Sequence, residues 1–314
     1  MHLTESHVLK EFFSQDRLFF LISISQASNI KNSATVFMYH KFGVSKYPST
    51  SVTLDQLKSH IDEFAKDKYN ILPLEFIVDT VINDGDLPNN TIGITVDDAD
   101  RSFLTVAWPK FKEKGFSVTL FVSTSTIIEN NKNYLSWNEI RQLKAEGVVI
   151  GAHSHTHEHL ANFTLEELQK EIEKSNKIFL KEIKETPNLY AYPYGETDDK
   201  IFNLLKKYHN NFAFLHAVSI YPPKISQLNL NMIKSISNSI SVPVGYSDHS
   251  ISTSIPSLAV ALGACIIEKH ITISRKEKGP DSQFSMEPKE LKNLIINIET
   301  TWSLMGSKKL FIKK

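Results

Sequence analysis

Short apolar runs alternate with stretches of helical hydrophobic spacing along the 314-residue chain. Apolar runs of this length predict buried strands, and apolar residues three and four positions apart predict amphipathic helices. The predicted strands lie near residues 35–39, 91–96, 117–122, 148–152, 189–192, 212–219, 242–246 and 264–271. The predicted helices cover 54–64, 103–114, 137–146, 165–180 and a final stretch from Pro288. Alternating strands and helices favour an α/β fold with a mostly parallel sheet, and about eight strands are what a closed (β/α) barrel needs.

The composition is that of a globular protein and sets limits on its partners. Hydrophobic residues make up 41% of the chain, and the 35 basic residues balance the 35 acidic ones. A zero formal charge gives no indication of binding to nucleic acid or to an anionic membrane. The single cysteine, Cys265, lies in an apolar run, which predicts a small core residue rather than a nucleophile.

The first 33 residues allow two interpretations. Arg17, the apolar run 18–22 and the small-residue pattern at 25–27 are typical of a secretory signal peptide. An amphipathic N-terminal helix is the alternative, since acidic residues precede the apolar run. We expect export to the periplasm or the medium rather than a cytoplasmic location. The run is too short to form a stable membrane span.

Two polar motifs follow predicted strands. Asp97 and Asp98 end the strand near 91–96, and a histidine-rich stretch follows the strand near 148–152. One carboxylate of an adjacent pair can bind a cation while the other takes a proton. Histidines four residues apart can converge on one metal ion. Two pairs have this spacing, His153 with His157 and His155 with His159, and the first is favoured because it directly follows the strand. We expect His155 and His159 to be exposed.

These motifs, in this order, resemble those of the NodB-type polysaccharide deacetylases. The motifs are Met38-Tyr39-His40, Thr95-Val96-Asp97-Asp98, Leu135-Ser136-Trp137, His153-Ser154-x-x-His157 and Ala191-Tyr192-Pro193-Tyr194-Gly195. The resemblance covers about residues 34–212 and is specific, because several unlike motifs agree.

The resemblance implies a role for each residue of the site. Asp98, His153 and His157 would hold a divalent metal, most simply Zn²⁺, that activates water. Asp97 would be the general base, and a backbone N–H near Tyr194 would help to hold the oxyanion. The chain departs from the family in two places. Ala99 stands where glycine is common, and Ala191 stands where many members have an arginine that orients the base.

The last third resembles a different family, the sialic-acid synthases of the NeuB type. The runs that carry the likeness are Phe214–Pro222, Val242–His249, Gly263–His270 and Gly279–Asp281. The match covers about residues 213–308. The early strands of that family, which carry most of its phosphoenolpyruvate contacts, have no counterpart here, and neither does its C-terminal antifreeze-like domain. In that family histidines at the positions of His216 and His249 bind a metal.

Together the two resemblances predict a hybrid or incomplete TIM-type barrel. Its parts are an N-terminal segment at 1–33, a deacetylase-like region at 34–212 and a synthase-like fragment at 213–314. The late deacetylase strands, which usually carry the general-acid histidine, are missing. His216 ends an apolar run, so it is the candidate replacement acid, and a packed histidine without a catalytic role is the favoured alternative.

The leading functional hypothesis is a metal-dependent de-N-acetylase acting on N-acetylated oligo- or polysaccharides. The alternatives are an enzyme related to nonulosonic acid synthases and a non-catalytic fusion that binds metal or sugar. The ranking follows site completeness, because the deacetylase site has three metal ligands and a base.

Overall fold

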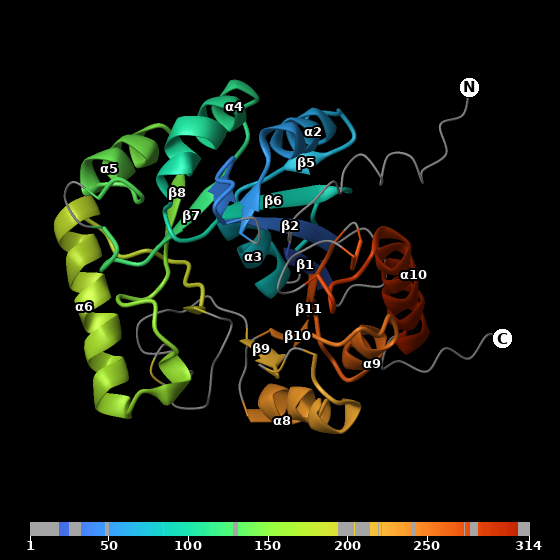
Figure 1. Ribbon diagram of the computed structural model, residues 1–314. Helices are drawn as coiled ribbons and strands as arrows, with labels where there is room; N and C mark the ends of the chain where they lie inside the picture. The colour runs from blue at the N-terminus through green and yellow to red at the C-terminus, as the bar shows by residue number, and fades with distance from the viewer. Residues whose placement is uncertain are drawn as a thin grey trace, which may run out of the picture.

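One sheet runs through both halves of the molecule (Figure 1). The computed structural model describes residues 19–24, 33–47, 50–83, 85–127, 131–193, 204, 214–218, 220, 222–239, 243–272, 274–276 and 282–306. Its main strands are β1 (Phe19–Ile24), β2 (Ser33–Tyr39), β6 (Thr91–Val96), β7 (Thr119–Val122), β8 (Val149–Ala152), β9 (Phe214–Ala217), β10 (Val244–Asp248) and β11 (Ile266–His270). They follow the order β8-β7-β6-β2-β1-β11-β10-β9. Short β5 (Asn70–Ile71) pairs with β6, and β3 (Lys41–Phe42) pairs with β4 (Ser51–Val52) in a small separate sheet.

Strand β1 joins the two halves. It pairs antiparallel with β2 on one side and with β11 on the other, whereas the other ladders of the main sheet are parallel. Leu21, for example, lies opposite both Val36 and Glu268. The apolar run that suggested a signal peptide is thus a strand of the sheet here. Residues 1–18, on which the N-terminal helix alternative depends, lie outside the described residues.

Most predicted strands are present, and one is reduced to a single contact. The run near 189–192 contributes only an isolated parallel bridge between Tyr190 and Ala152. Within the part of the chain that the structure describes, no ladder joins β8 to β9. The observed fold is therefore α/β with a mostly parallel sheet. It agrees with the predicted hybrid or incomplete barrel.

The helices pack against the sheet, and the predicted ones begin where the sequence indicates. Helices α2 (Leu54–Phe64), α5 (Trp137–Ala145), α6 (Leu165–Ile183) and α10 (Pro288–Met305) match predicted elements. Thr53, Ser136 and Thr164 each cap a helix through a reciprocal capping box. The stretch predicted at 103–114 is a π-helical turn, Phe103–Ala107, followed by α4 (Trp108–Glu113). Helices α3 (Leu74–Ile82), α8 (Asn231–Ser239) and α9 (Ile255–Ala261) were not individually predicted.

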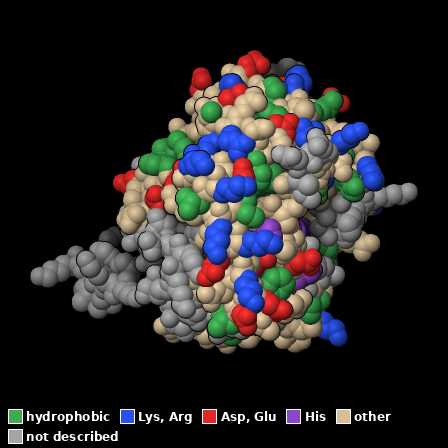
Figure 2. Space-filling model, turned by 90° about the vertical axis from the view of Figure 1, so that its left-hand side faces the viewer, with side chains coloured by type: hydrophobic (Ala, Val, Ile, Leu, Met, Phe, Trp, Pro, Cys, Tyr) green, Lys and Arg blue, Asp and Glu red, His purple; other side chains and the backbone are tan. Residues whose placement is uncertain are grey.

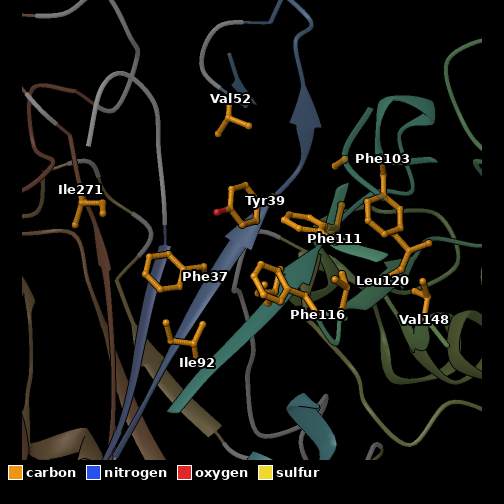
Figure 3. Close-up of a cluster of buried hydrophobic side chains, with 14 of the residues drawn as sticks. Phe37, Tyr39, Val52, Ile92, Phe103, Phe111, Phe116, Leu120, Val148 and Ile271 are labelled. Atoms are coloured by element: carbon orange, nitrogen blue, oxygen red, sulfur yellow. The ribbon is translucent and has the colours of Figure 1, made fainter. Parts of the chain in front are cut away.

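A single apolar core extends across the two halves. Phe37 of β2, Phe111 of α4 and Ile271, which follows β11, belong to one cluster of buried side chains (Figure 3). The same cluster includes Leu291 and Leu294 of α10. Close-packed interiors transmit strain from one part to another. This continuity therefore favours one folding unit over a folded front half with a loosely attached tail.

Alternation along the strands separates an outer face from an inner face. Ile94 and Val96 of β6 and Ile267 of β11 pack in the core between sheet and helices. Successive side chains of a strand point to opposite faces, so Thr95 and Glu268 point to the inner face. This alternation decides which polar side chains lie on the same face of the sheet.

Two further findings concern composition. None of the helices described here combines the length and the apolar character that a membrane crossing requires. The thiol of Cys265 contacts the carbonyl oxygen of Val244 at 3.3 Å, and burial raises its pKa to about 11. The residue is half-buried, so the predicted core position is reached only in part.

Candidate metal centre

The two aspartates lie in a turn that directly follows β6. The N–H of Asp97 donates to the carbonyl oxygen of Tyr39 at 2.8 Å, which continues the pairing of β6 with β2. Asp98 and Ala99 then adopt left-handed backbone conformations, with φ of 69° and 55°. Glycine adopts this conformation without strain, which explains why glycine is common at the position of Ala99 in the resembling family. Asp98 belongs to the cluster of possible metal ligands with His153 and His157, and Asp97 does not.

The histidine loop begins where β8 ends. Its backbone is held to β7 and the following turn, because the hydroxyl of Ser123 donates to the carbonyl oxygen of His153. Ser154 and His157 have positive φ values of 65° and 60°. The N–H of His157 donates to Ser154 Oγ at 3.0 Å, which closes the loop locally. Strained backbone of this kind clusters at functional sites.

Helix α6 fixes the same loop through one buried carboxylate. Glu171 Oε1 accepts from the N–H of His155 at 2.9 Å and from Thr156 Oγ1 at 2.8 Å. It also accepts from the N–H of Thr156. A carboxylate that holds consecutive backbone donors makes the loop rigid without contacting the site itself.

Asp98, His153 and His157 come together as predicted. One possible ligand atom from each lies within 4.8 Å of the others. His157 Nε2 is 3.2 Å and His153 Nε2 is 3.8 Å from Asp98 Oδ1. Histidine side chains also reach the surface in a patch among charged side chains (Figure 2). His153 is buried and His157 is partly exposed, so the cluster lies at the edge of the interior.

The donor set fits a divalent metal ion. Two imidazole nitrogens and one carboxylate oxygen form a common protein ligand set for zinc, with room for further ligands. His153 Nδ1–H donates to the carbonyl oxygen of Ala191 at 2.9 Å, which sets the tautomer and leaves Nε2 facing the cluster. This outer hydrogen bond is typical of histidines that bind metals.

The electrostatics of the three ligands are coupled. Burial alone would raise the pKa of Asp98, but the hydrogen bond from His157 and the charges of His40 and His153 hold it well below its usual range. Burial lowers the pKa of His153 to about 4. Asp98 as a carboxylate and His153 as a neutral imidazole are the protonation states that bind a metal.

Asp97 is placed for a different task. It is 5% exposed, and its Oδ1 has no hydrogen-bond partner among the described residues. Burial, then the negative charges of Asp98 and Glu268, raise its pKa well above the usual range. A divalent cation beside it would favour the carboxylate form again. No arginine holds this carboxylate in the described part, in agreement with Ala191 at the position where the family often has one.

Three further residues named in the sequence analysis lie outside the metal cluster or outside the described residues. Tyr194 lies outside the described residues, so its role stays a prediction. His159 is exposed as expected, but the same expectation for His155 was wrong. His155 is 8% exposed and contacts Thr124 Oγ1 at 2.7 Å through Nδ1, because the loop folds back towards the turn after β7.

The structure does not bring His216 into the metal cluster. Its Nε2–H donates to the carbonyl oxygen of Leu228 at 2.8 Å, and its ring packs against Tyr246. Leu228 and Tyr246 belong to the core between sheet and helices. His216 therefore lies on the outer face of β9, opposite to the side that carries Asp97. The favoured alternative, a packed histidine, describes its surroundings.

His216→Ala is expected to leave acetate release within roughly twofold of wild type, since a group on the outer face cannot supply a general acid's contribution of ~10²–10⁴-fold. Turnover as a function of pH, with metal content measured in parallel, checks this. Loss of the alkaline limb of the profile at full metal content would restore His216 as the acid.

Sequence reasoning missed three residues that shape the site. His40 is close enough for its charge to affect Asp98, and its signal was the Met38-Tyr39-His40 motif. Glu171 carried no signal beyond its place in an amphipathic helix. Glu268 lies in the synthase-like half, and only the closing of the sheet brings its charge to Asp97.

Two family models match this chain. The model described as polysaccharide deacetylase matches residues 84–213, and the NeuB family model matches residues 170–310. The chain thus combines a deacetylase-like and a NeuB-like segment, as the motifs predicted. The two matches overlap, so the boundary at 212 stays a prediction.

Curated relatives match about a third of this chain. An N,N'-diacetyllegionaminic acid synthase from Legionella pneumophila is 39% identical over 108 residues, which is 33% of this chain and 30% of that protein. The human N-acetylneuraminate-9-phosphate synthase is 34% identical over 113 residues, 36% of this chain and 32% of that protein. The chain therefore spans about a third of the length of these relatives.

Two solved structures resemble this chain over about half of its length. A Streptococcus pyogenes deacetylase, PplD, in complex with acetate has a TM-score of 0.51 at 20% identity, covering 55% of this chain and 78% of that one. IcaB from Ammonifex degensii has a TM-score of 0.51 at 18% identity, covering 56% and 80%. At this identity the likeness shows the fold.

Proposed function

We propose that the protein is a metal-dependent carbohydrate de-N-acetylase that hydrolyses the acetamide group of an N-acetylated amino sugar. The convergence of Asp98, His153 and His157 beside the buried carboxylate of Asp97 carries this proposal. The match to the polysaccharide deacetylase model supports it.

Each group has a distinct part in the proposed reaction. A divalent ion held by Asp98, His153 and His157 would supply Lewis-acid activation of water and of the acetyl carbonyl. Asp97 takes the proton from the attacking water, and its unpartnered Oδ1 is the acceptor available for that proton. Hydrolysis then breaks the C–N bond and yields acetate and the free amino sugar, whose nitrogen takes the proton that Asp97 received from water.

Acetate release tests the proposal. Purified protein incubated with N-acetylated chito-oligosaccharides should release acetate, lose this activity with a chelator and recover it when Zn²⁺ is added back. Mg²⁺ added at the same concentration is the control, because hard cations prefer all-oxygen ligand sets. Acetate release that survives complete removal of metal would contradict the proposal.

A synthase activity is a second candidate, because the NeuB family model matches residues 170–310 and a third of the chain is 39% identical to an N,N'-diacetyllegionaminic acid synthase. The outcome expected here is negative. Phosphoenolpyruvate and N-acetylmannosamine should give no product, since the chain spans about a third of those enzymes. Chromatographic analysis for nonulosonic acids, beside an authentic synthase as positive control, checks this. Any such product would reverse the ranking.

A further inference from the structure

A buried carboxylate of helix α6 contacts the loop between the two histidine ligands. Glu171 is 6% exposed. Its Oε1 accepts hydrogen bonds from the N–H of His155, from the N–H of Thr156 and from the hydroxyl of Thr156. A carboxylate is seldom buried unless such partners offset its loss of hydration. These three bonds therefore account for the buried position of Glu171.

The first histidine ligand is held by strand contacts that do not involve α6. The N–H of His153 donates to the carbonyl oxygen of Val122 at 3.0 Å, and the hydroxyl of Ser123 donates to the carbonyl oxygen of His153. The ring of His153 is fixed by its hydrogen bond to the carbonyl oxygen of Ala191. The ends of β7 and β8 therefore place His153.

The second histidine ligand lies five residues beyond the end of β8 and needs another anchor. The N–H of His157 donates to Ser154 Oγ at 3.0 Å, and both residues have left-handed backbone conformations. Residues other than glycine keep this conformation only where the surrounding structure holds them. The backbone N–H of the preceding residue, Thr156, is one that Glu171 holds. Glu171 therefore fixes the segment that carries His157.

A metal site binds more tightly when its ligands are already in place. His157 Nε2 lies 3.2 Å from Asp98 Oδ1, so the two side chains are ready to share an ion. A loose segment before His157 would have to be ordered on metal binding, and the loss of conformational entropy would weaken the affinity. Outer groups that orient metal ligands typically contribute about 10–100-fold to metal affinity.

We propose that Glu171 is a positioning residue for the metal centre. Its hydrogen bonds to His155 and Thr156 hold His157 where it can bind the ion. The inference rests on the metal site of the proposed function and makes helix α6 a part of that site. Because Glu171 acts on the loop and not on the reacting groups, its effect falls on metal affinity rather than on the chemical step.

The affinity for Zn²⁺, measured by competition with a chromophoric chelator, tests this role. Glu171→Ala should weaken Zn²⁺ binding about 10–100-fold. Glu171→Gln should weaken it less, because an amide oxygen still accepts hydrogen bonds but less strongly than a carboxylate. Thr156→Val, which removes one hydroxyl donor at an exposed position, should also weaken binding by a smaller factor. Glu166→Gln is the matched control, because Glu166 is an exposed glutamate of the same helix.

Acetate release by the same variants separates positioning from a general structural role. At saturating Zn²⁺, kcat of Glu171→Gln and Thr156→Val should return to nearly the wild-type value, because the metal ligands and Asp97 are unchanged. Thermal unfolding of the metal-free variants shows whether they remain folded. A lowered Tm together with an activity that Zn²⁺ does not restore would assign Glu171 a structural role and contradict the inference.

The remaining outcomes also decide the question. Wild-type Zn²⁺ affinity in both Glu171→Gln and Thr156→Val would overturn the inference, even if Glu171→Ala fails to fold. Low kcat at saturating Zn²⁺ in folded variants would place Glu171 in the reaction itself and overturn it as well. Wild-type protein that binds no Zn²⁺ would refute the metal site and the role of Glu171 with it. Wild-type protein that binds Zn²⁺ but releases no acetate would refute the deacetylase function alone, since the affinity measurements still test Glu171.

Discussion

Asp98→Asn and His153→Ala are expected to lose both bound metal and acetate release, whereas Asp97→Asn should keep the metal and lose activity by ~10²–10⁴-fold. The reason is geometric, since Asp98 lies 3.2 Å from His157 Nε2, while Asp97 lies apart from that cluster with an unpartnered oxygen. Removing one of three protein ligands opens the coordination site, and removing the base leaves it intact.

Metal content by elemental analysis and acetate release on the same samples check this division of roles. His159→Ala is the matched control, because it removes an exposed histidine of the same loop that is outside the cluster. Metal lost from Asp97→Asn and retained in Asp98→Asn would reverse the two assignments.

Leu21→Pro is expected to destabilise the whole molecule, because β1 pairs on both sides. Proline removes a ladder donor and leaves the facing acceptor unpaired, which costs roughly 1–3 kcal/mol. For a protein of this size such a loss lowers Tm by roughly 2–5 °C. Thermal unfolding of Leu21→Pro beside Leu21→Val, which keeps a strand-forming residue, measures the effect. An unchanged Tm for the proline variant would show that β1 does not carry the junction.

Strand β1 coincides with the apolar run of the predicted signal peptide. Cleavage after residue 27 would remove β1 and leave the edges of β2 and β11 without this partner. Mass spectrometry of the mature protein shows whether the N-terminal segment is cleaved or retained. A mature chain that retains residues 19–24 fits the sheet, and a folded, active chain that lacks them would contradict the role proposed for β1.

The sequence by itself determined the elements that depend on local chemistry. Capping boxes at Ser136 and Thr164 predicted helix starts, because the cap and the third helical residue satisfy each other within one turn. The pairing of Asp98 with His153 and His157 was also predictable, since parallel strands end at the same edge of a sheet and the motifs occur in a familiar order.

Only the tertiary structure decided what depends on long-range packing. The run 18–22 is apolar whether it becomes a leader or a strand, and only the folded chain shows that residues 19–24 pair with β2 and β11. His216 ends an apolar run as a catalytic histidine would, yet strand alternation turns it to the outer face. Glu268 carries no local sign that its charge influences the pKa of Asp97, because only the order of the strands in the sheet relates these two segments, which are more than a hundred residues apart in the sequence.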